Sequence, residues 1–120
     1  MRAMNTVSGR ILGSALSLWA FAGQASAQSY DCSQSAQASE RAVCGSDRLS
    51  GLDERMSSLY DSLMSATTSD RGRAKLRSYQ LHFLAARDAC GRNTSCIKGA
   101  YLDQIEVLQA RLRVAERDGD

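Results

Sequence analysis

Four cysteines, one histidine and a large set of charged side chains are the residues of this chain that can do chemistry. A catalytic site requires a nucleophile with a base, a carboxylate pair in a cleft, or a bound metal. His82 lies next to Leu81 and Phe83 in a helical pattern and has no recognisable catalytic companion. The cysteine spacings are not the C-x-x-C of a zinc or redox centre. We therefore expect no catalytic residue, no metal, no cofactor and no enzyme activity, and so small a domain leaves little volume for a pocket.

Residues 1–27 have the pattern of a secretory signal peptide. Arg2 and Arg10 stand at the start, an apolar stretch covers residues 11–22, and Ala25-Ser26-Ala27 forms an A-x-A cleavage site. The stretch is shorter than the ~20 apolar residues that span a bilayer. Gln28 follows the site, whereas a lipoprotein has a cysteine there. We expect residues 28–120 to form one exported domain, periplasmic or secreted, without a membrane anchor.

The charge balance of this expected domain argues against nucleic acid as a partner. The full chain has 15 lysines and arginines against 13 aspartates and glutamates, and without Arg2 and Arg10 both counts are 13. Nucleic-acid-binding domains usually keep a clear cationic surplus. The balance is neutral, so we expect no nucleic-acid partner, and the same neutrality disfavours binding to a membrane surface.

The four cysteines predict two disulfides, because an even number in a short exported chain is typical of a disulfide framework. Three pairings are possible, and the sequence alone does not choose between them. We favour Cys32 with Cys44 and Cys90 with Cys96, since each pair brackets a turn. Each closed loop contributes on the order of 2 to 3 kcal/mol in the chain-entropy treatment.

Helices joined by short turns are expected to position these side chains, since the chain contains no proline. Residues 35–44 predict a short first helix that ends at Gly45. Ser46 or Asp47 then caps a longer helix. Its apolar residues recur at steps of three and four, which predicts one buried stripe made of Leu49, Leu52, Met56, Leu59 and Leu63.

Two further helices follow. The polar run 67–70 offers Asp70 as the next cap, and the apolar face of that helix, which ends at Cys90 and Gly91, contains Leu76, Tyr79, Phe83 and Ala86. Asn93 or Thr94 begins the last helix, which frays over residues 116–120 and carries Ile97, Tyr101, Ile105, Leu108 and Leu112 on one face. The expected fold is all-α: three antiparallel helices with the short first helix clipped to them by a disulfide.

The same residues form a motif that resembles the LprI-like lysozyme inhibitor N-terminal family over nearly the whole expected domain. The matching residues are Cys32, Glu40-Arg41-Ala42-Val43-Cys44, Leu49, Leu52-Asp53, Tyr60, Gln80, Phe83-Leu84, Arg87-Asp88-Ala89-Cys90, Cys96-Ile97 and Tyr101. Phe83 replaces the tryptophan that the family usually has, which keeps an aromatic ring in the core. The resemblance implies a helical exported protein, and the family takes its name from a lysozyme-inhibiting lipoprotein.

The polar motif residues have a structural and a functional interpretation. Asp53 and Arg87 lie on separate predicted helices, so an ion pair between them, joined by Gln80, can fix the helix register. The alternative is a recognition patch exposed on one side of the bundle. We favour the structural role for the motif residues Asp53, Tyr60, Gln80, Phe83, Arg87, Asp88 and Tyr101.

Two charge clusters are candidate partner-binding surfaces. A basic cluster at the start of a helix, where the macrodipole disfavours cations, consists of Arg71, Arg73, Lys75 and Arg77. An acidic stripe with a spacing of seven residues consists of Asp47, Glu54 and Asp61. Both clusters can also be ordinary solvated helix faces. If the protein inhibits a lysozyme, the acids steer the approach of its basic rim and a cation enters its cleft, which holds two catalytic carboxylates.

We therefore expect an exported protein-binding domain, with inhibition of a lysozyme (muramidase) as the leading function. This function is implied by the resemblance, and no residue chemistry establishes it. The alternative is a periplasmic envelope or stress protein that contacts another partner and no lysozyme. Addition of the purified domain to a cell-wall lysis assay separates the two.

Overall fold

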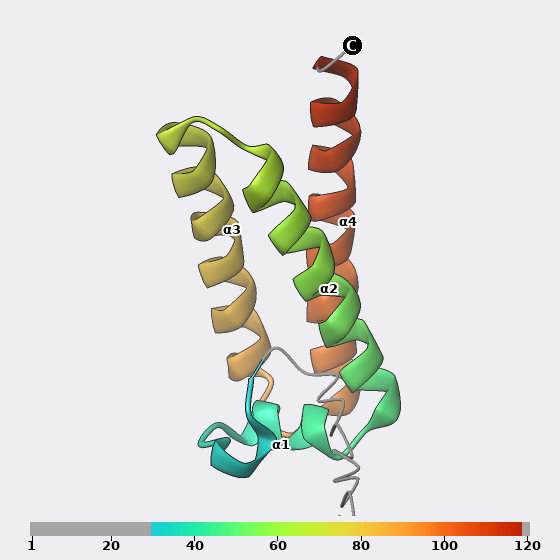
Figure 1. The fold of residues 1–120 in the computed structure, drawn as a ribbon. Helices are drawn as coiled ribbons and strands as arrows, with labels where there is room; N and C mark the ends of the chain where they lie inside the picture. The colour runs from blue at the N-terminus through green and yellow to red at the C-terminus, as the bar shows by residue number, and fades with distance from the viewer. Residues whose placement is uncertain (1–29, 119–120) are drawn as a thin grey trace, which may run out of the picture.

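The computed structural model describes residues 30–118, which form four α-helices and one short 3-10 turn (Figure 1). The turn η1 covers Cys32–Gln34, and the helices are α1 (Ala38–Cys44), α2 (Asp47–Ala66), α3 (Asp70–Ala89) and α4 (Thr94–Asp118). The predicted all-α bundle is confirmed for this part of the chain. The predicted signal peptide lies outside the described residues. No helix within residues 30–118 is long and apolar enough to cross a membrane.

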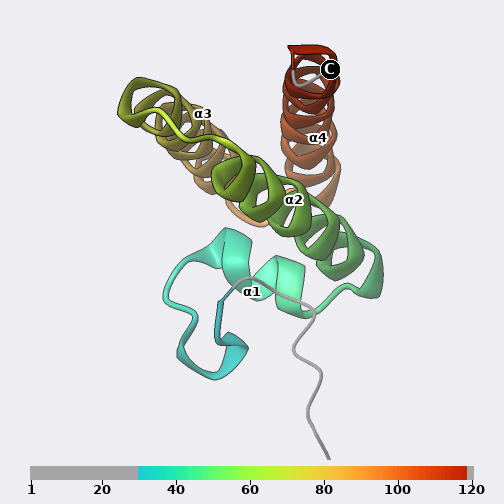
Figure 2. The same ribbon diagram turned by 45° about the horizontal axis from the view of Figure 1, so that its top comes forward.

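Three long helices run up, down and up, and the short α1 lies across one end of them (Figures 1 and 2). α2 packs against both other long helices, most extensively against α4. At the opposite end, α3 and α4 splay apart, and the last turns of α4 rise beyond the connection between α2 and α3 (Figure 1). The bundle is therefore closed by α1 at one end and open at the other.

Both disulfides have the pairing that we favoured. Cys32 is bonded to Cys44 and Cys90 to Cys96, with Cα–Cα distances of 5.9 and 5.6 Å. The first bond ties the start of the described chain to the end of α1, and the second joins the end of α3 to the first turn of α4. Among the described residues no cysteine is free.

The first helix is shorter than predicted, because it begins at Ala38 and not at residue 35. The disulfide explains the difference. Seven helical residues carry the backbone about 10 Å along the helix axis, yet Cys32 must lie beside Cys44. The intervening chain therefore returns in an extended form, as the backbone angles of Ser35 and Gln37 show.

Side-chain caps set most of the other helix ends. The Ser46 hydroxyl accepts a hydrogen bond from Leu49 N at the start of α2, one of the two caps expected there. For α3 the predicted cap, Asp70, is wrong: Ser69 accepts from Gly72 N, and Asp70 is the first helical residue. At α4 the Asn93 side chain accepts from Cys96 N, as expected.

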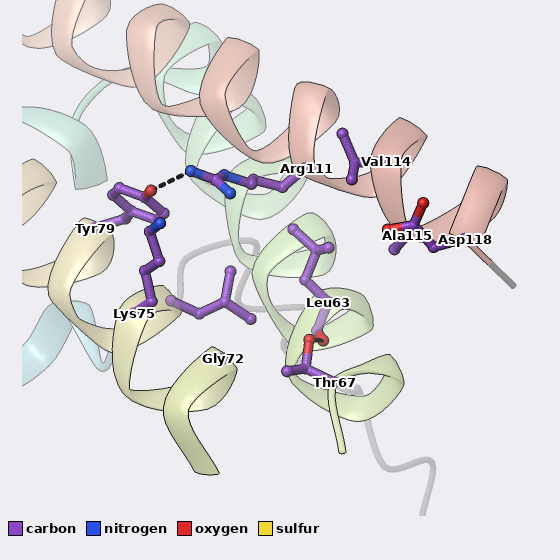
Figure 3. Close-up of a pocket in the computed structure, with 10 residues that line it drawn as sticks. Leu63, Thr67, Gly72, Lys75, Tyr79, Arg111, Val114, Ala115 and Asp118 are labelled. Carbon is purple, nitrogen blue, oxygen red and sulfur yellow. Dashed lines mark hydrogen bonds between the residues drawn. The ribbon is translucent and has the colours of Figure 1, made fainter. Parts of the chain in front are cut away.

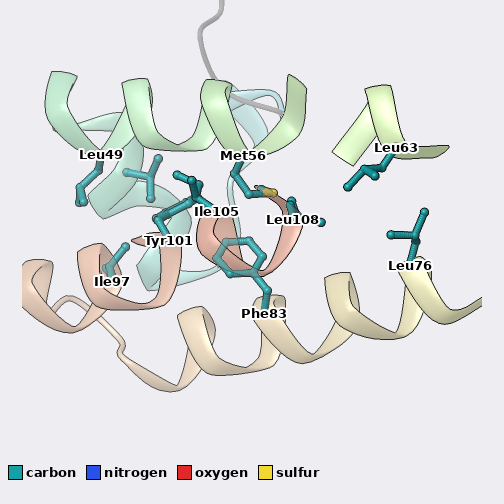
Figure 4. Close-up of a cluster of buried hydrophobic side chains, with 10 residues drawn as sticks. Leu49, Met56, Leu63, Leu76, Phe83, Ile97, Tyr101, Ile105 and Leu108 are labelled. Atoms are coloured by element: carbon teal, nitrogen blue, oxygen red, sulfur yellow. The ribbon is translucent and has the colours of Figure 1, made fainter. Parts of the chain in front are cut away.

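The core lies between α2, α3 and α4 (Figure 4). Phe83 packs against Tyr101 with ring centroids 4.9 Å apart. Of the stripe predicted for α2, Leu49, Met56 and Leu63 are buried, while Leu52 and Leu59 are partly buried against the core.

The prediction for the end of the α3 stripe is wrong. Ala86 is exposed, and Arg87 occupies the buried position with 2% exposure. Ala86 and Arg87 lie three and four residues after Phe83, so helical spacing allowed either of them to be the next buried position. The pattern of apolar residues predicted burial of the alanine, whereas the arginine is the buried residue in the structure.

Candidate functional site

Arg87 of α3 is the centre of a polar cluster that joins α1 to the long helices. Its guanidinium donates to Asp88 Oδ1 from Nε and Nη2, at 3.0 and 2.9 Å, and to Glu40 Oε1 of α1 at 3.4 Å. Ser39 of α1 donates to the same Asp88 oxygen at 2.7 Å. The guanidinium also lies 5.4 Å from the centroid of the Tyr30 ring, a cation–π distance. A buried arginine therefore fastens α1 to α3.

A second buried bond links α2 to α4. The Tyr101 hydroxyl donates to Asp53 Oδ1 at 2.8 Å, and both side chains are fully buried. Tyr101 also interacts with Arg87, and this interaction raises the pKa of the arginine. The carboxylates of Glu40 and Asp88 pair with Arg87, at 3.4 and 2.9 Å. A direct ion pair of Asp53 with Arg87 stays a prediction. Gln80 accepts a hydrogen bond from Gln104 of α4 at 3.3 Å.

Burial and these contacts fix the charge states of the cluster. Burial raises the pKa of Tyr30 to about 12, and the negative charge of Asp53 acts in the same direction. Burial also raises the pKa of Tyr101, again with the help of Asp53. Burial opposes the charge of Arg87, but its interactions with Tyr101 and Asp88 outweigh burial and leave its pKa raised. At neutral pH both tyrosines are neutral and the arginine is charged.

The surface above this cluster is hollowed into a pocket of about 480 Å³ where α1, α2 and α3 meet. We call it the motif pocket, because five of its lining residues belong to the family motif. The lining consists of Tyr30, Glu40, Ser57, Tyr60, Asp61, Gln80, Leu84 and Arg87. The expectation of little pocket volume is therefore wrong. The wedge between the crossing α1 and two long helices creates this space.

The motif pocket combines aromatic rings, hydrogen-bonding groups and a surplus of one carboxylate. Glu40 and Asp61 stand against the single cation Arg87, which Glu40 and Asp88 already neutralise. Tyrosines and carboxylates together favour an incoming cationic or hydrogen-bond-donating group. The lining contains no cysteine or histidine. Such a site is suited to recognition of a partner side chain.

The acidic stripe meets this pocket. Asp47, Glu54 and Asp61 are all exposed, and Asp61 is also one of the pocket's lining residues. The residues between them on the same helix face are Gly51 and Ser58, which are exposed and short. From Asp47 to Asp61 the stripe is about 21 Å long. It therefore presents three carboxylates on a face with no bulky side chain between them.

The structure separates the four residues of the basic cluster, although all are exposed. Arg73 donates from Nε and Nη2 to the Met64 carbonyl oxygen and so braces the connection between α2 and α3. Lys75 lines a different pocket, at the open end of the bundle. Arg77 precedes Gln80, Leu84 and Arg87 by three, seven and ten residues, which places it on the α3 face that lines the motif pocket. Arg71 lies on another side of the helix.

Four lining residues, Tyr30, Glu40, Ser57 and Leu84, were missed as site residues at the sequence level. Tyr30 precedes every predicted helix, so no periodicity points to it. Glu40 belongs to the matched motif, but its role depends on contact with Arg87, 47 residues later. Ser57 lies four residues after Asp53 and four before Asp61, a helical spacing that was a usable signal.

Within residues 30–118, no group of three or more histidine, cysteine, aspartate or glutamate side chains is placed to hold a metal ion. The fold and the motif pocket together define a class: a small, disulfide-bonded helical domain with a pocket beside an acidic helix face.

Comparison with known proteins identifies the family. The chain belongs to the lysozyme inhibitor LprI family, whose model matches residues 32–117. It is similar to the proteins named lipoprotein LprI in Mycobacterium bovis and Mycobacterium tuberculosis, each 31% identical over 84 residues. The match covers 68% of this chain and 41% of each relative, so it spans about two fifths of the relatives' length. No solved structure gives a significant match. The family resemblance inferred from the motif is thus confirmed.

Proposed function

We propose that this protein is an exported inhibitor of lysozyme that binds the enzyme through the acidic stripe and the motif pocket. The observation that carries the proposal is the family match, which covers residues 32–117 and thus almost every described residue. Two disulfides and a relative named as a lipoprotein support export. The periplasm or the exterior of the cell is the proposed location.

Electrostatics supports a basic partner for the α2 face. The acids of the stripe form no ion pair with any residue of the described chain, so their charges remain available. Rim charges of this kind mainly raise the rate at which an oppositely charged partner associates. Lysozymes of the animal type are strongly basic, and their association with the stripe is therefore expected to be fast and salt-sensitive.

Arg77 is the proposed inserting cation. A muramidase cleft contains two catalytic carboxylates, and an arginine can form two parallel hydrogen bonds with one of them. Arg77 is exposed on the α3 face that carries the motif pocket, and it forms no ion pair within residues 30–118. Along the helix axes, Asp61 lies about 8 Å before the end of α2, and Arg77 lies about 10 Å after the start of α3. The two residues are therefore at similar heights on neighbouring helices.

A cell-wall lysis assay with a basic animal-type lysozyme tests this proposal. Purified residues 28–120 are expected to slow lysis in a dose-dependent manner. Replacement of Arg77 by glutamine should weaken inhibition about tenfold or more, because a charge-assisted bidentate contact is lost. Arg71→Gln is the matched control on the same helix and should inhibit like the parent.

Two results would contradict the proposal at different levels. Absence of inhibition by the folded parent chain removes the lysozyme function and leaves the alternative of another envelope partner. Inhibition that Arg71→Gln and Arg77→Gln weaken equally, or not at all, removes the assignment of Arg77 while leaving the function intact.

A further inference from the structure

A second pocket, of about 320 Å³, lies at the open end of the bundle, and we call it the distal pocket (Figure 3). It shares no lining residue with the motif pocket. α2 contributes Leu63 and Thr67, α3 contributes Leu76 and Tyr79 among others, and the last turns of α4 form the remaining wall. Its volume is at the lower end of the range for small-molecule sites, which begins near 300 Å³.

The wall of the distal pocket is largely apolar. Leu63 and Leu76 are 2% and 5% exposed and face each other from α2 and α3. Val114 and Ala115 line the pocket from α4, and 42% of Val114 is exposed to solvent. The helices α3 and α4 splay apart at this end of the bundle (Figure 1). An aliphatic chain laid against Val114 would remove this apolar surface from water.

Two cations stand beside the apolar wall. The Arg111 guanidinium donates to the Tyr79 hydroxyl and lies 5.1 Å from the centroid of that ring, which holds it across the gap between α4 and α3. Lys75 approaches the same tyrosine from α3 (Figure 3). Neither cation has a carboxylate partner in the described chain, and Asp118 is the one acid of the lining. The pocket therefore carries a net positive charge at its Tyr79 side.

The geometry points to a free medium-chain fatty acid as the ligand of the distal pocket. Its carboxylate would accept hydrogen bonds from Lys75 and from the N–H groups of Arg111 that Tyr79 leaves unused. Its alkyl chain would lie between Leu63, Leu76 and Val114. A second copy of the chain fits less well, because stable protein interfaces bury about 800 Å² on each partner, far more than a pocket of this volume offers. This inference does not depend on lysozyme inhibition.

Isothermal titration calorimetry with sodium decanoate below its micellar concentration tests the inference on residues 28–120. We expect saturable binding of one decanoate per chain. Decanol lacks the charge and acetate lacks the alkyl chain, so each should bind at least about tenfold more weakly than decanoate. Lys75→Met and Arg111→Met should each weaken decanoate binding about tenfold, and Val114→Glu should weaken it through repulsion and loss of apolar contact.

Matched controls are available on the same helices. Arg77→Met on α3 and Arg113→Met on α4 each remove one cation outside the pocket lining and should bind decanoate like the parent. The inference is overturned if decanoate does not saturate, if decanol binds as tightly as decanoate, or if the control variants lose as much affinity as Lys75→Met. Binding to anionic phospholipid vesicles without binding to free decanoate would also overturn it.

Discussion

Replacement of Arg87 by methionine should destabilise the fold by about 3 kcal/mol. Methionine keeps an unbranched apolar chain like the stem of the arginine but removes the guanidinium, with its charge and its donors. Breaking a buried ion pair by removing one partner costs about 3 to 5 kcal/mol. The side chains of Glu40 and Asp88 are 22% and 32% exposed, so water can replace part of the lost hydrogen bonding. We therefore expect a loss of stability at the lower end of this range. In a domain of this size the melting temperature should fall by roughly 12 to 24 °C.

Thermal unfolding of residues 28–120 followed by circular dichroism measures this effect. Arg92→Met, at an exposed site in the connection between α3 and α4, is the matched control and should change stability by less than about 0.5 kcal/mol. If Arg87→Met is as stable as this control and instead loses partner binding, Arg87 is a recognition residue and the structural assignment is wrong.

Three further outcomes are expected. Gly51→Ala should stabilise the protein by about 0.5 to 1 kcal/mol in urea unfolding, because an added Cβ meets nothing within 4 Å, whereas Gly72→Ala should destabilise it because the Cβ lies 2.7 Å from a side chain of the preceding connection. In an absorbance titration, Tyr30 and Tyr101 of the folded protein should ionise at higher pH than the tyrosines of the urea-unfolded protein. Because their folded pKa values are raised, their contribution to stability is complete below pH ~10 and is lost as the pH rises toward about 12; a titration in which all four tyrosines ionise near pH ~10 would refute this. Thiol titration under denaturing, non-reducing conditions should find no free cysteine, and two or more free thiols would show that at least one of the two disulfides is absent.

Helix positions were largely predictable from the sequence, because apolar spacing and cap residues act locally. The apolar stripes of α2 and α4 contain most of the buried residues of those helices, and Gly91, with a φ of 56°, follows the end of α3 as a glycine stop should. The start of α1 was not predictable in this way. It depends on the disulfide between Cys32 and Cys44, which forces the intervening chain to turn back.

The candidate site was predictable in its residues but not in its contacts. The motif contained Arg87, Asp53 and Tyr101, yet hydrophobic periodicity assigns no buried position to an arginine. Arg87 is buried because Glu40, on a helix far away in sequence, packs beside it. The motif pocket requires three helices to converge, and no local spacing encodes that convergence.

The most direct measurement of the central claim is the association rate constant with a basic lysozyme, measured over a range of salt concentrations for two charge-reversal variants. Asp47→Lys/Glu54→Lys/Asp61→Lys reverses the acidic stripe, and Asp103→Lys/Glu106→Lys/Glu116→Lys makes the same net charge change at exposed sites on α4. The account predicts that the stripe variant stays helical and associates about tenfold more slowly at low salt. The α4 variant should be affected much less, and the difference should shrink as salt rises. Equal rates for the two folded variants across all salt concentrations would show that the stripe is a solvated face and contradict the account.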